Sequence, residues 1–514
     1  GLINTLGQGV SLYLNKGTAV NLKNGFTINV NNESFMLYSK DSSGSYSSVL
    51  NTDGISAANI KNGGFGFYYD KNTGTDAENF LRNTVSGTGI LNLNMEKEAV
   101  LIFLDETTVS PQYLSNLDIN LSNIGNALKI NGSGYYNYGF NKVGLIVDKN
   151  INLDNPDDTY LKNIYSSSDI DVNTGIDITG SKSGQIFIIQ ANYDGSPGRN
   201  AVTINNNGNI TLSGNNSAGI LADFGEIYNN AGGAVNILGS NSKALVSLNG
   251  TAVFNDGVIN IGGADSAGIY GSNNFVGVSA VYGNEKIEIH NSGVIQSVSD
   301  QDNIYGIYSI NEKVPVTDAR VILTGSSRIL LENSENSVGI FLENSTLNGS
   351  GIVEVGNEGI GLYGHNSVIN LNNFTMNLSG NNALGFYLRG NTVFNAAGGL
   401  NTININGTNN ILYYFTSDFN GLFNQDFIVN SAPGSTYMLG VIKDMSYLYN
   451  GTADLGEGGI FVYGTDTSVT LGVNGHLESQ YDNVIGIYLD GVYATAPYEA
   501  LNTGDRKSTR LNSS

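Results

Sequence analysis

The sequence predicts an all-β protein, a right-handed parallel β-helix (β-solenoid) with three sheets and about 25 residues per coil. Three observations lead to this prediction: a recurring marker, short alternating strands, and a composition rich in turn-forming residues. Glycine accounts for 67 of 514 residues, whereas proline accounts for only 6. Charged residues make up 13% of the chain, about half the usual share, so the composition favours ordered structure over disorder.

The recurring marker is a Gly-Ile pair or a close variant of it. Ser-Ala-Gly-Ile begins at Ser217 and again at Ser266, and Ser-Lys-Ala-Leu begins between them at Ser242. The steps are 25 and 24 residues (242 − 217 and 266 − 242). We predict stacked core residues, and glycines that turn or approach a neighbour closely, at Gly219, Ile220, Ala244, Leu245, Gly268, Ile269, Gly339, Ile340, Gly385 and Phe386. The Asn and Ser residues beside them are expected to form side-chain ladders from coil to coil.

A tighter form of the marker, Asn-x-x-Gly followed by Ile, Leu or Phe, recurs along the chain. It begins at Asn141, Asn216, Asn303, Asn336, Asn382 and Asn483. Short strands that alternate apolar and polar residues lie between the markers, at 208–212, 234–239, 257–262, 351–356, 367–371, 401–406 and 468–473. A unit of this size cannot bury its own apolar face, so successive copies must stack into a solenoid.

The repeat also predicts the domain organisation. Residues 1–140 are expected to be β-helix coils with a looser register, and residues 141–504 to form a regular β-helix. The length of the chain would allow three domains, but the repeat favours one elongated domain. The intervals from Gly268 to Gly306 and from Gly306 to Gly339 are longer than one coil, which predicts inserted loops that could carry binding. The last ten residues, 505–514, show no coil pattern and are interpreted as a non-native tail.

Composition excludes several classes of function. The chain has no cysteine, which excludes disulfides, a thiol nucleophile and thiolate metal sites and suits export in an unfolded state. The net charge of −22 argues against nucleic acid as a partner. No apolar run reaches the length of a membrane-spanning helix. No signal peptide is readable at Gly1, so we expect a fragment of a longer protein.

These features together resemble the passenger domain of type V secretion (autotransporter) proteins of Gram-negative bacteria. The segments "NNNGNITLSGNNSAGI", "GVINIGGADSAGIYG" and "NSENSVGIFLENSTLNGSG" are most similar to the large fusobacterial RadD-like adhesins. The resemblance covers roughly 140–500, and 1–140 more loosely. It implies a cell-surface virulence adhesin, anchored to the outer membrane by a C-terminal β-barrel of the parent chain. Its partner would be a glycan or a protein on host cells or other bacteria.

The same scaffold also carries polysaccharide lyases and hydrolases, so carboxylate clusters were considered as catalytic candidates. The candidates are Asp154, Asp157 and Asp158, and Asp300 with Asp302. None has an adjacent basic residue, so we interpret them as solvated surface residues, with a Ca²⁺ ion as an alternative for the first group. No Gly-x-Ser-x-Gly motif occurs. We therefore expect no catalytic residue, no metal site and no cofactor.

Histidine and tyrosine give the remaining signals. His290, His365 and His476 are interpreted as exposed polar residues, and the 75-residue spacing of the first two (365 − 290) places them on one face three coils apart. The chain has 29 tyrosines and no tryptophan. Tyr135, Tyr136 and Tyr138 crowd one expected loop and form a weak candidate binding site. The alternative is that most tyrosines stack inside or along the sheets.

Three functional hypotheses follow. The first is a non-catalytic adhesive rod whose loops attach to other surfaces, strengthened by many copies per cell. The second is a carbohydrate-active enzyme, which converging carboxylates on the outer face would favour. The third is a purely structural stalk of a larger adhesin, with the adhesive site elsewhere in the parent chain.

Overall fold

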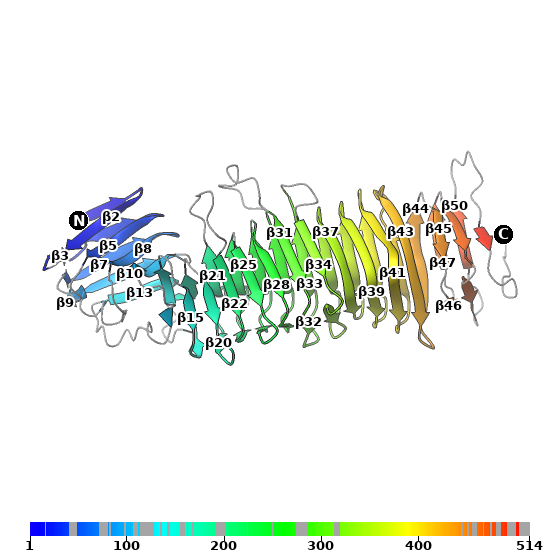
Figure 1. Ribbon diagram of the computed structural model, residues 1–514, viewed down its shortest axis with the longest axis horizontal. Coiled ribbons are helices and arrows are strands. Elements are labelled where there is room, and N and C mark those ends of the chain that lie inside the picture. Colours follow the sequence, from blue (N-terminus) through cyan, green and yellow to red (C-terminus); the bar gives the residue numbers. More distant parts are fainter. Residues whose placement is uncertain are drawn as a thin grey trace. The chain divides into compact units, whose positions relative to one another are not determined.

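The computed structural model describes most of the chain (Figure 1). The described residues are 1–15, 17–40, 49–70, 81, 84–96, 99–105, 112–113, 128–133, 136–140, 144–154, 160–161, 163–166, 169–191, 202–223, 225–248, 250–273, 286–312, 319–443, 446–449, 452–454, 460–465, 467–472, 475–479, 485–490 and 500–502. The tail 505–514 and the expected insertions at 274–285 and 313–318 lie outside them.

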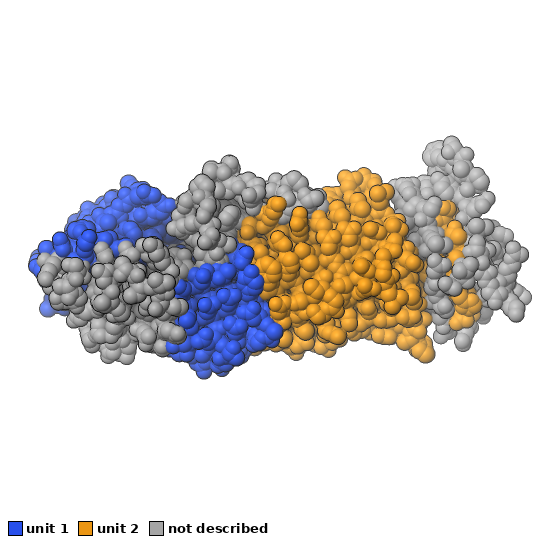
Figure 2. Space-filling view, viewed as in Figure 1, with its two compact units in different colours: residues 1–235 blue, residues 236–514 orange. Residues whose placement is uncertain are grey.

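The paired strands of the described chain run parallel, and successive coils add strands to shared sheets. The predicted parallel β-helix is therefore confirmed. The chain divides into two compact units, Gly1–Val235 and Asn236–Ser514 (Figure 2). This division does not test the predicted change of register near residue 140, which stays a prediction. β26 (Ala234–Ile237) contains the boundary between the units.

In unit 1, the early coils place their three strands in three different sheets, as expected. The first sheet contains β1 (Leu2–Thr5), β4 (Thr27–Val30), β7 (Ile55–Ile60), β10 (Ile90–Met95), β13 (Leu128–Ser133) and β17 (Tyr160–Leu161). The second contains β2 (Gly9–Asn15), β5 (Ser34–Lys40), β8 (Phe65–Asp70), β11 (Val100–Asp105), β14 (Tyr136–Phe140), β18 (Ile164–Ser166), β21 (Ile186–Ala191) and β24 (Ala218–Asp223). The third contains β3 (Ala19–Lys23), β6 (Val49–Asp53) and β9 (Val85–Gly87). A further sheet begins later in unit 1 and contains β12 (Gln112–Tyr113), β15 (Leu145–Val147), β16 (Ile151–Asn152), β19 (Ile170–Val172), β20 (Asp177–Gly180), β22 (Val202–Asn206), β23 (Asn209–Leu212) and β25 (Gly225–Asn229).

In unit 2, two of the three strands of a coil share one sheet. The sheet named here the tyrosine sheet contains β27 (Lys243–Leu248), β30 (Ala267–Ser272), β33 (Tyr305–Ile310), β36 (Val338–Glu343), β38 (Ile360–His365), β40 (Leu384–Arg389), β42 (Asn410–Phe415), β44 (Tyr437–Lys443), β47 (Ile460–Thr465) and β50 (Ile485–Asp490). The amide sheet contains β28 (Ala252–Asn255), β29 (Val258–Ile261), β31 (Ile287–Asn291), β32 (Val294–Ser297), β34 (Ala319–Leu323), β35 (Arg328–Leu331), β37 (Thr346–Val355), β39 (Val368–Leu378), β41 (Val393–Ile405) and β43 (Leu422–Ser431). Two small sheets comprise β45 (Ser446–Tyr449), β48 (Ser468–Leu471) and β51 (Ala500–Asn502), and β46 (Thr452–Asp454) with β49 (His476–Glu478).

The length of a coil varies along the chain, as the unequal intervals between markers predict. Ala267 pairs with Tyr305 across a long coil (305 − 267 = 38), whereas Val338 pairs with Ile360 across a short one (360 − 338 = 22). The register of the inward residues is nevertheless kept, since Ile269 pairs with Ile307 across the long coil and Ile340 with Leu362 across the short one.

The apolar marker residues lie in the core. Ile220 pairs with Ile188 in unit 1, and Leu245 pairs with Ile269 in unit 2. From Ile269 the column continues, coil by coil, through Ile307, Ile340, Leu362, Phe386 and Tyr413, all of them fully buried. Ala244 is also fully buried.

The marker glycines lie where neighbouring chain segments approach closely. A Cβ on Gly339 would lie 2.5 Å from Cγ1 of Val353 and 2.6 Å from the carbonyl oxygen of Gly361. Gly268 has similar surroundings: a Cβ there would lie 2.7 Å from Cγ2 of Ile295 and 2.8 Å from the carbonyl oxygen of Gly306. A Cβ on Gly385 would lie 2.8 Å from the carbonyl oxygen of Leu412. Close approach, rather than a positive φ, therefore explains these glycines.

The asparagine that begins the tighter marker forms the corner before β33, β36 and β40 of the tyrosine sheet. Asn303, Asn336 and Asn382 have φ values of 59°, 50° and 55°, and Asn216 of unit 1 has 55°. Asparagine tolerates this left-handed backbone better than most residues. Asn141 and Asn483 lie outside the described residues.

Hydrogen-bonded polar side chains connect the coils, as the sequence predicts. In unit 1, Asn29 donates to Asn4 over 2.7 Å, Asn59 to Asn29 over 2.7 Å, and Asn94 to Asn59 over 2.8 Å. In unit 2, the backbone N–H of Ser242 donates to Oγ of Ser266 over 3.1 Å. Each bond joins equivalent positions of neighbouring coils, so the ladders stabilise the stack.

Candidate functional site

The tyrosine sheet presents three outward columns of side chains on unit 2. Strand β38 shows how they arise: Gly361, Leu362 and Gly364 are buried, whereas Ile360, Tyr363 and His365 are half-buried and face outward. Because the marker Gly and the following apolar residue both point inward, the outward positions are the first, fourth and sixth. The same pattern occurs in β33 and β40.

The fourth position forms a stack of aromatic rings, named here the aromatic ladder. Its members are Tyr270, Tyr308, Phe341, Tyr363, Tyr387 and Tyr414, which are paired from strand to strand. Neighbouring ring centroids are 4.5–5.4 Å apart and the planes differ by 2–21°. The ring faces therefore cover one another, and the ladder presents its edges and phenolic hydroxyls outward.

Burial modifies the ionisation of the ladder. Removal from water raises the pKa of Tyr308 to about 12, with smaller contributions from Tyr270 and Tyr305. The pKa of Tyr387 is also raised, chiefly by burial. At the first rung, Nζ of Lys243 lies 5.3 Å from the centroid of the Tyr270 ring, and burial lowers the pKa of this lysine. The phenols of Tyr308 and Tyr387 are thus neutral hydrogen-bond donors at physiological pH.

The columns on either side of the ladder differ in chemistry. The first position contributes an aliphatic column in which Val338 is buried and Ile360, Leu384 and Ile411 are half-buried. The sixth position contributes a polar column in which Glu343, His365 and Arg389 follow one another on β36, β38 and β40. An apolar edge and a charged edge therefore flank the aromatic rings.

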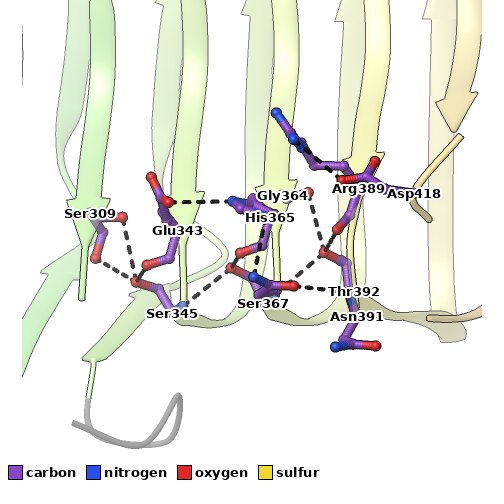
Figure 3. Close-up of polar contacts among 11 residues, drawn as sticks. Ser309, Glu343, Ser345, Gly364, His365, Ser367, Arg389, Asn391, Thr392 and Asp418 are labelled. Atoms are coloured by element: carbon purple, nitrogen blue, oxygen red, sulfur yellow. Dashed lines mark hydrogen bonds and ion pairs between the residues drawn. The ribbon is translucent and has the colours of Figure 1, made fainter. Parts of the chain in front are cut away.

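The polar column is held by a directed series of hydrogen bonds (Figure 3). The backbone N–H of Asn391 donates to Oδ1 of Asn366 over 2.9 Å. This bond directs Nδ2 of Asn366 toward Nε2 of His365, 3.1 Å away, so Nε2 accepts and the ring hydrogen lies on Nδ1. Nδ1 in turn lies 3.3 Å from Oε1 of Glu343. Glu343 and His365 are therefore oriented relative to each other.

Arg389 ends this part of the column. Its Nη2 lies 3.3 Å from Oδ2 of Asp418. The pKa of Asp418 is lowered, first by a hydrogen bond from Thr416 and then by Arg389. The pKa of Arg389 is raised by Tyr363 and Asp418.

Serine hydroxyls lie beside the Glu343–His365 pair, a combination of residue types found in hydrolases. However, Oγ of Ser367 donates to the backbone carbonyl of His365 over 2.8 Å, and Oγ of Ser345 donates to the carbonyl of Glu343 over 2.9 Å. Both serines are fully buried. No bond joins either hydroxyl to the imidazole, so the described geometry lacks the nucleophile–base contact that such chemistry needs.

The carboxylates considered from the sequence do not converge. Asp154 accepts hydrogen bonds from the backbone and hydroxyl of Ser181, at 2.6 and 2.8 Å, and so acts as a turn connector. Asp157 and Asp158 lie outside the described residues. Asp300 and Asp302 lie in a corner, where the Asp302 carbonyl accepts from the N–H of Asp265. Within the described ranges, no group of three His, Asp or Glu side chains could hold a metal ion.

The histidine interpretation needs two corrections. His290 lies on β31 of the amide sheet and His365 on β38 of the tyrosine sheet, so they do not share a face, because coil lengths between them are unequal. Their side chains are 27% and 24% exposed, hence half-buried rather than exposed. Each histidine lies beside a glutamate: His290 at 2.6 Å from Glu288, and His476 at 3.3 Å from Glu478.

The expectation that the tyrosine cluster lies in a loop is wrong for Tyr136 and Tyr138. Tyr136 and Tyr138 lie in strand β14, paired with Ile164 and Ile102, because the Tyr-rich segment continues the alternation of the second sheet. Tyr135 lies outside the described residues. A binding role for these tyrosines stays a prediction.

The aromatic ladder is the feature that sequence reasoning missed. Its signal is an aromatic residue directly after the marker, as in Gly268-Ile269-Tyr270 and Gly361-Leu362-Tyr363. Tyr68 belongs to a similar stack in unit 1, 4.4 Å from Tyr38. The alternative expectation, that tyrosines stack along the sheets, holds for the ladder residues.

The comparisons with known proteins leave the family open. No protein-family model matches the chain, and no curated protein matches it. In the described ranges, no helix has the length and apolarity required to cross a membrane.

Proposed function

We propose that this chain is a non-catalytic segment of a cell-surface adhesin, a β-helical scaffold that attaches to host cells or other bacteria. The observation that carries the proposal is the aromatic ladder, which runs over six strands with an aliphatic column on one side and a charged column on the other. Exposed, rigid aromatic surface of this kind is typical of recognition surfaces.

Two further observations support a binding role over a carbohydrate-active enzyme. The hydroxyls of Ser345 and Ser367 bond backbone carbonyls. Of the described carboxylates, Asp154 lies in a turn where it accepts hydrogen bonds from Ser181, whereas Asp300 and Asp302 lie in one corner of unit 2. An enzyme of this class needs two carboxyl groups on opposite sides of one sugar bond.

The cellular setting proposed here comes from the resemblance to autotransporter passengers. The segment would lie outside the cell, anchored through an outer-membrane part of the parent chain. Its partner would be a surface glycan or protein, contacted weakly by each copy and strongly by many. The glycine markers and the polar ladders support the scaffold part of this proposal.

The test is retention of cells by the chain displayed on beads. Beads are incubated with epithelial cells and with partner bacteria, and free sugars and free amino acids are added as competitors. Saturable, competable retention is expected, and it should fall when Tyr363 and Tyr387 are both changed to Ser. The matched control changes Asn370 and Asn395, which lie outward on the amide sheet, to Ser. If beads that carry the folded protein retain no cells, the result would instead favour a purely structural stalk.

A further inference from the structure

The charges along the polar column of the tyrosine sheet would match those of a second copy of the same column placed opposite it in reverse order. Glu343 and Arg389 lie one coil before and one coil after His365, at equivalent positions of β36, β38 and β40. Their side chains are 34% and 39% exposed. A half-turn about an axis parallel to the strands and level with His365 exchanges the positions of the two charges.

We infer that the outer face of the tyrosine sheet docks a second copy of this chain, with the two β-helix axes antiparallel. In that pairing each column faces the same column of the partner copy in reverse order. Glu343 then faces the Arg389 position of the other copy, twice per dimer, which is the reciprocity of an isologous interface. The inference does not depend on adhesion to other cells.

The two charged groups retain capacity for this contact. Arg389 uses Nη2 for Asp418 and also interacts with Tyr363, and its Nε is buried, so the remaining Nη hydrogens are the donors left for a partner. Glu343 uses Oε1 for His365 and keeps a second carboxylate oxygen. The series from Asn391 to Glu343 orients the carboxylate, so less side-chain freedom is lost on docking.

Under the same rotation, the aromatic ladder faces the aromatic ladder of the second copy, and the aliphatic column faces the aliphatic column. In the aromatic ladder, Phe341 faces the Tyr387 position and Tyr363 faces its own equivalent. In the aliphatic column, half-buried Ile360 faces its own equivalent, and Leu384 lies opposite the position of Val338, which is only 8% exposed. Ring faces are already covered within each ladder, so the contact is made by ring edges and aliphatic groups, at the ~10 Å separation of packed sheets.

The size of the face predicts a weak dimer. The five strands from β33 to β42 lie symmetrically about β38, and at ~4.8 Å between strands and ~3.3 Å for each of six residues they give a face of roughly 19 by 20 Å. The buried area is therefore at the low end for specific interfaces. One like-charged contact opposes docking: Asp418 faces the position of Glu312, and both lie at the exposed margin of the face. D418N is accordingly expected to strengthen the dimer.

A linear glycan is the competing occupant of this surface, and the observations favour it less. Sugars bind aromatic side chains by stacking on ring faces. Those faces are occupied along the ladder, where neighbouring planes differ by 2–21°. Charge complementarity instead favours a second copy.

The experiment measures self-association of the full chain by sedimentation over a concentration series. E343R places arginine opposite arginine, and R389E places glutamate opposite glutamate, so each variant alone should associate at least roughly tenfold more weakly. An equimolar mixture of the two restores both opposite-charge contacts and should associate like the unaltered chain. E288R is the control, because it makes the same charge change on the amide sheet.

Cross-linking gives a second, independent measurement. The chain has no cysteine, so H365C introduces one thiol at the proposed centre of symmetry. A bis-maleimide that spans ~10 Å should couple two copies faster through H365C than through N370C on the amide sheet. Equal coupling, or a mixture of E343R and R389E that stays monomeric while both variants are folded, overturns the proposal. Glycan-dependent shifts without self-association would assign the face to the competing occupant.

Discussion

The backbone N–H of Asn391 determines which nitrogen of the His365 ring accepts a hydrogen bond, although the two residues lie on different coils. The connection runs through Asn366, whose Oδ1 accepts from Asn391 over 2.9 Å and whose Nδ2 lies 3.1 Å from Nε2 of His365. A single main-chain donor therefore orients two side chains and places the ring hydrogen toward Glu343.

This relationship predicts the effect of N366D. The carboxylate that this substitution introduces would present an acceptor to Nε2 in place of a donor, so hydrogen on both ring nitrogens becomes favourable. With three histidines in the chain, selective ¹⁵N labelling gives three ring systems to assign. The His365 ring signals should shift, because the partner of Nε2 changes from a donor to an acceptor, and N370D should leave them unchanged. Unchanged His365 signals in N366D would contradict the assignment.

A second prediction concerns the marker glycines. G339A places a methyl group within 2.5 Å of Val353 and 2.6 Å of the Gly361 carbonyl, so one of the two strands must move. Overpacking of this kind costs about 1–3 kcal/mol. The urea unfolding midpoint of unit 2 should fall, whereas G398A, with no heavy atom within 4 Å of its new Cβ, should have little effect. Equal midpoints would refute close approach as the reason for glycine.

A third prediction compares two neighbouring aromatic residues. Phe386 is fully buried and contacts the rings of Phe394 and Tyr413, whereas Tyr387 lies half-buried in the ladder. F386A should lower the free energy of unfolding by about 3–5 kcal/mol, because it leaves a large cavity. Y387A should cost less than half of that. Chemical denaturation of the two variants under identical conditions gives the comparison, and a reversed order would show that the core column is wrongly placed.

The raised pKa of Tyr308 predicts a loss of stability in alkali. Folding raises this pKa from 10 to about 12, so the folded state holds the phenolic proton more tightly than the unfolded state. The associated stability is complete below pH 10 and is lost as the pH rises from 10 to about 12. The unfolding midpoint should therefore fall across that range, and less steeply in Y308F. A parallel absorbance titration of phenolate should show Y308F losing one late-titrating group.

Much of the fold is predictable from sequence because a solenoid repeats its local rules. The Gly-Ile pair at Gly268 and Ile269 is repeated at Gly339 and Ile340. The isoleucines that this pattern predicts to be buried do lie in one buried column. The corner at Asn336 is similarly signalled by a residue that tolerates left-handed backbone. Such features depend on neighbours within a few residues.

The candidate site was less predictable because it depends on which residues become neighbours one coil later. Tyr270 and Tyr308 are separated by an unusually long coil (308 − 270 = 38), yet their rings stack at 5.4 Å. A constant coil length fails here, and the same assumption placed His290 and His365 on one face. Pairing the markers rather than counting residues aligns Tyr308 with Phe341 and Tyr363.

The recurring marker also has a genetic consequence. Gly361 and Gly385 occupy the same position in adjacent coils (385 − 361 = 24). Joining Gly361 directly to Phe386 removes one whole turn and recreates an intact marker at the junction. Unequal recombination between repeats can therefore shorten or lengthen the gene in whole coils while each product keeps its reading register and its buried column. Coil number is thus a property that such a lineage can vary without redesigning the fold.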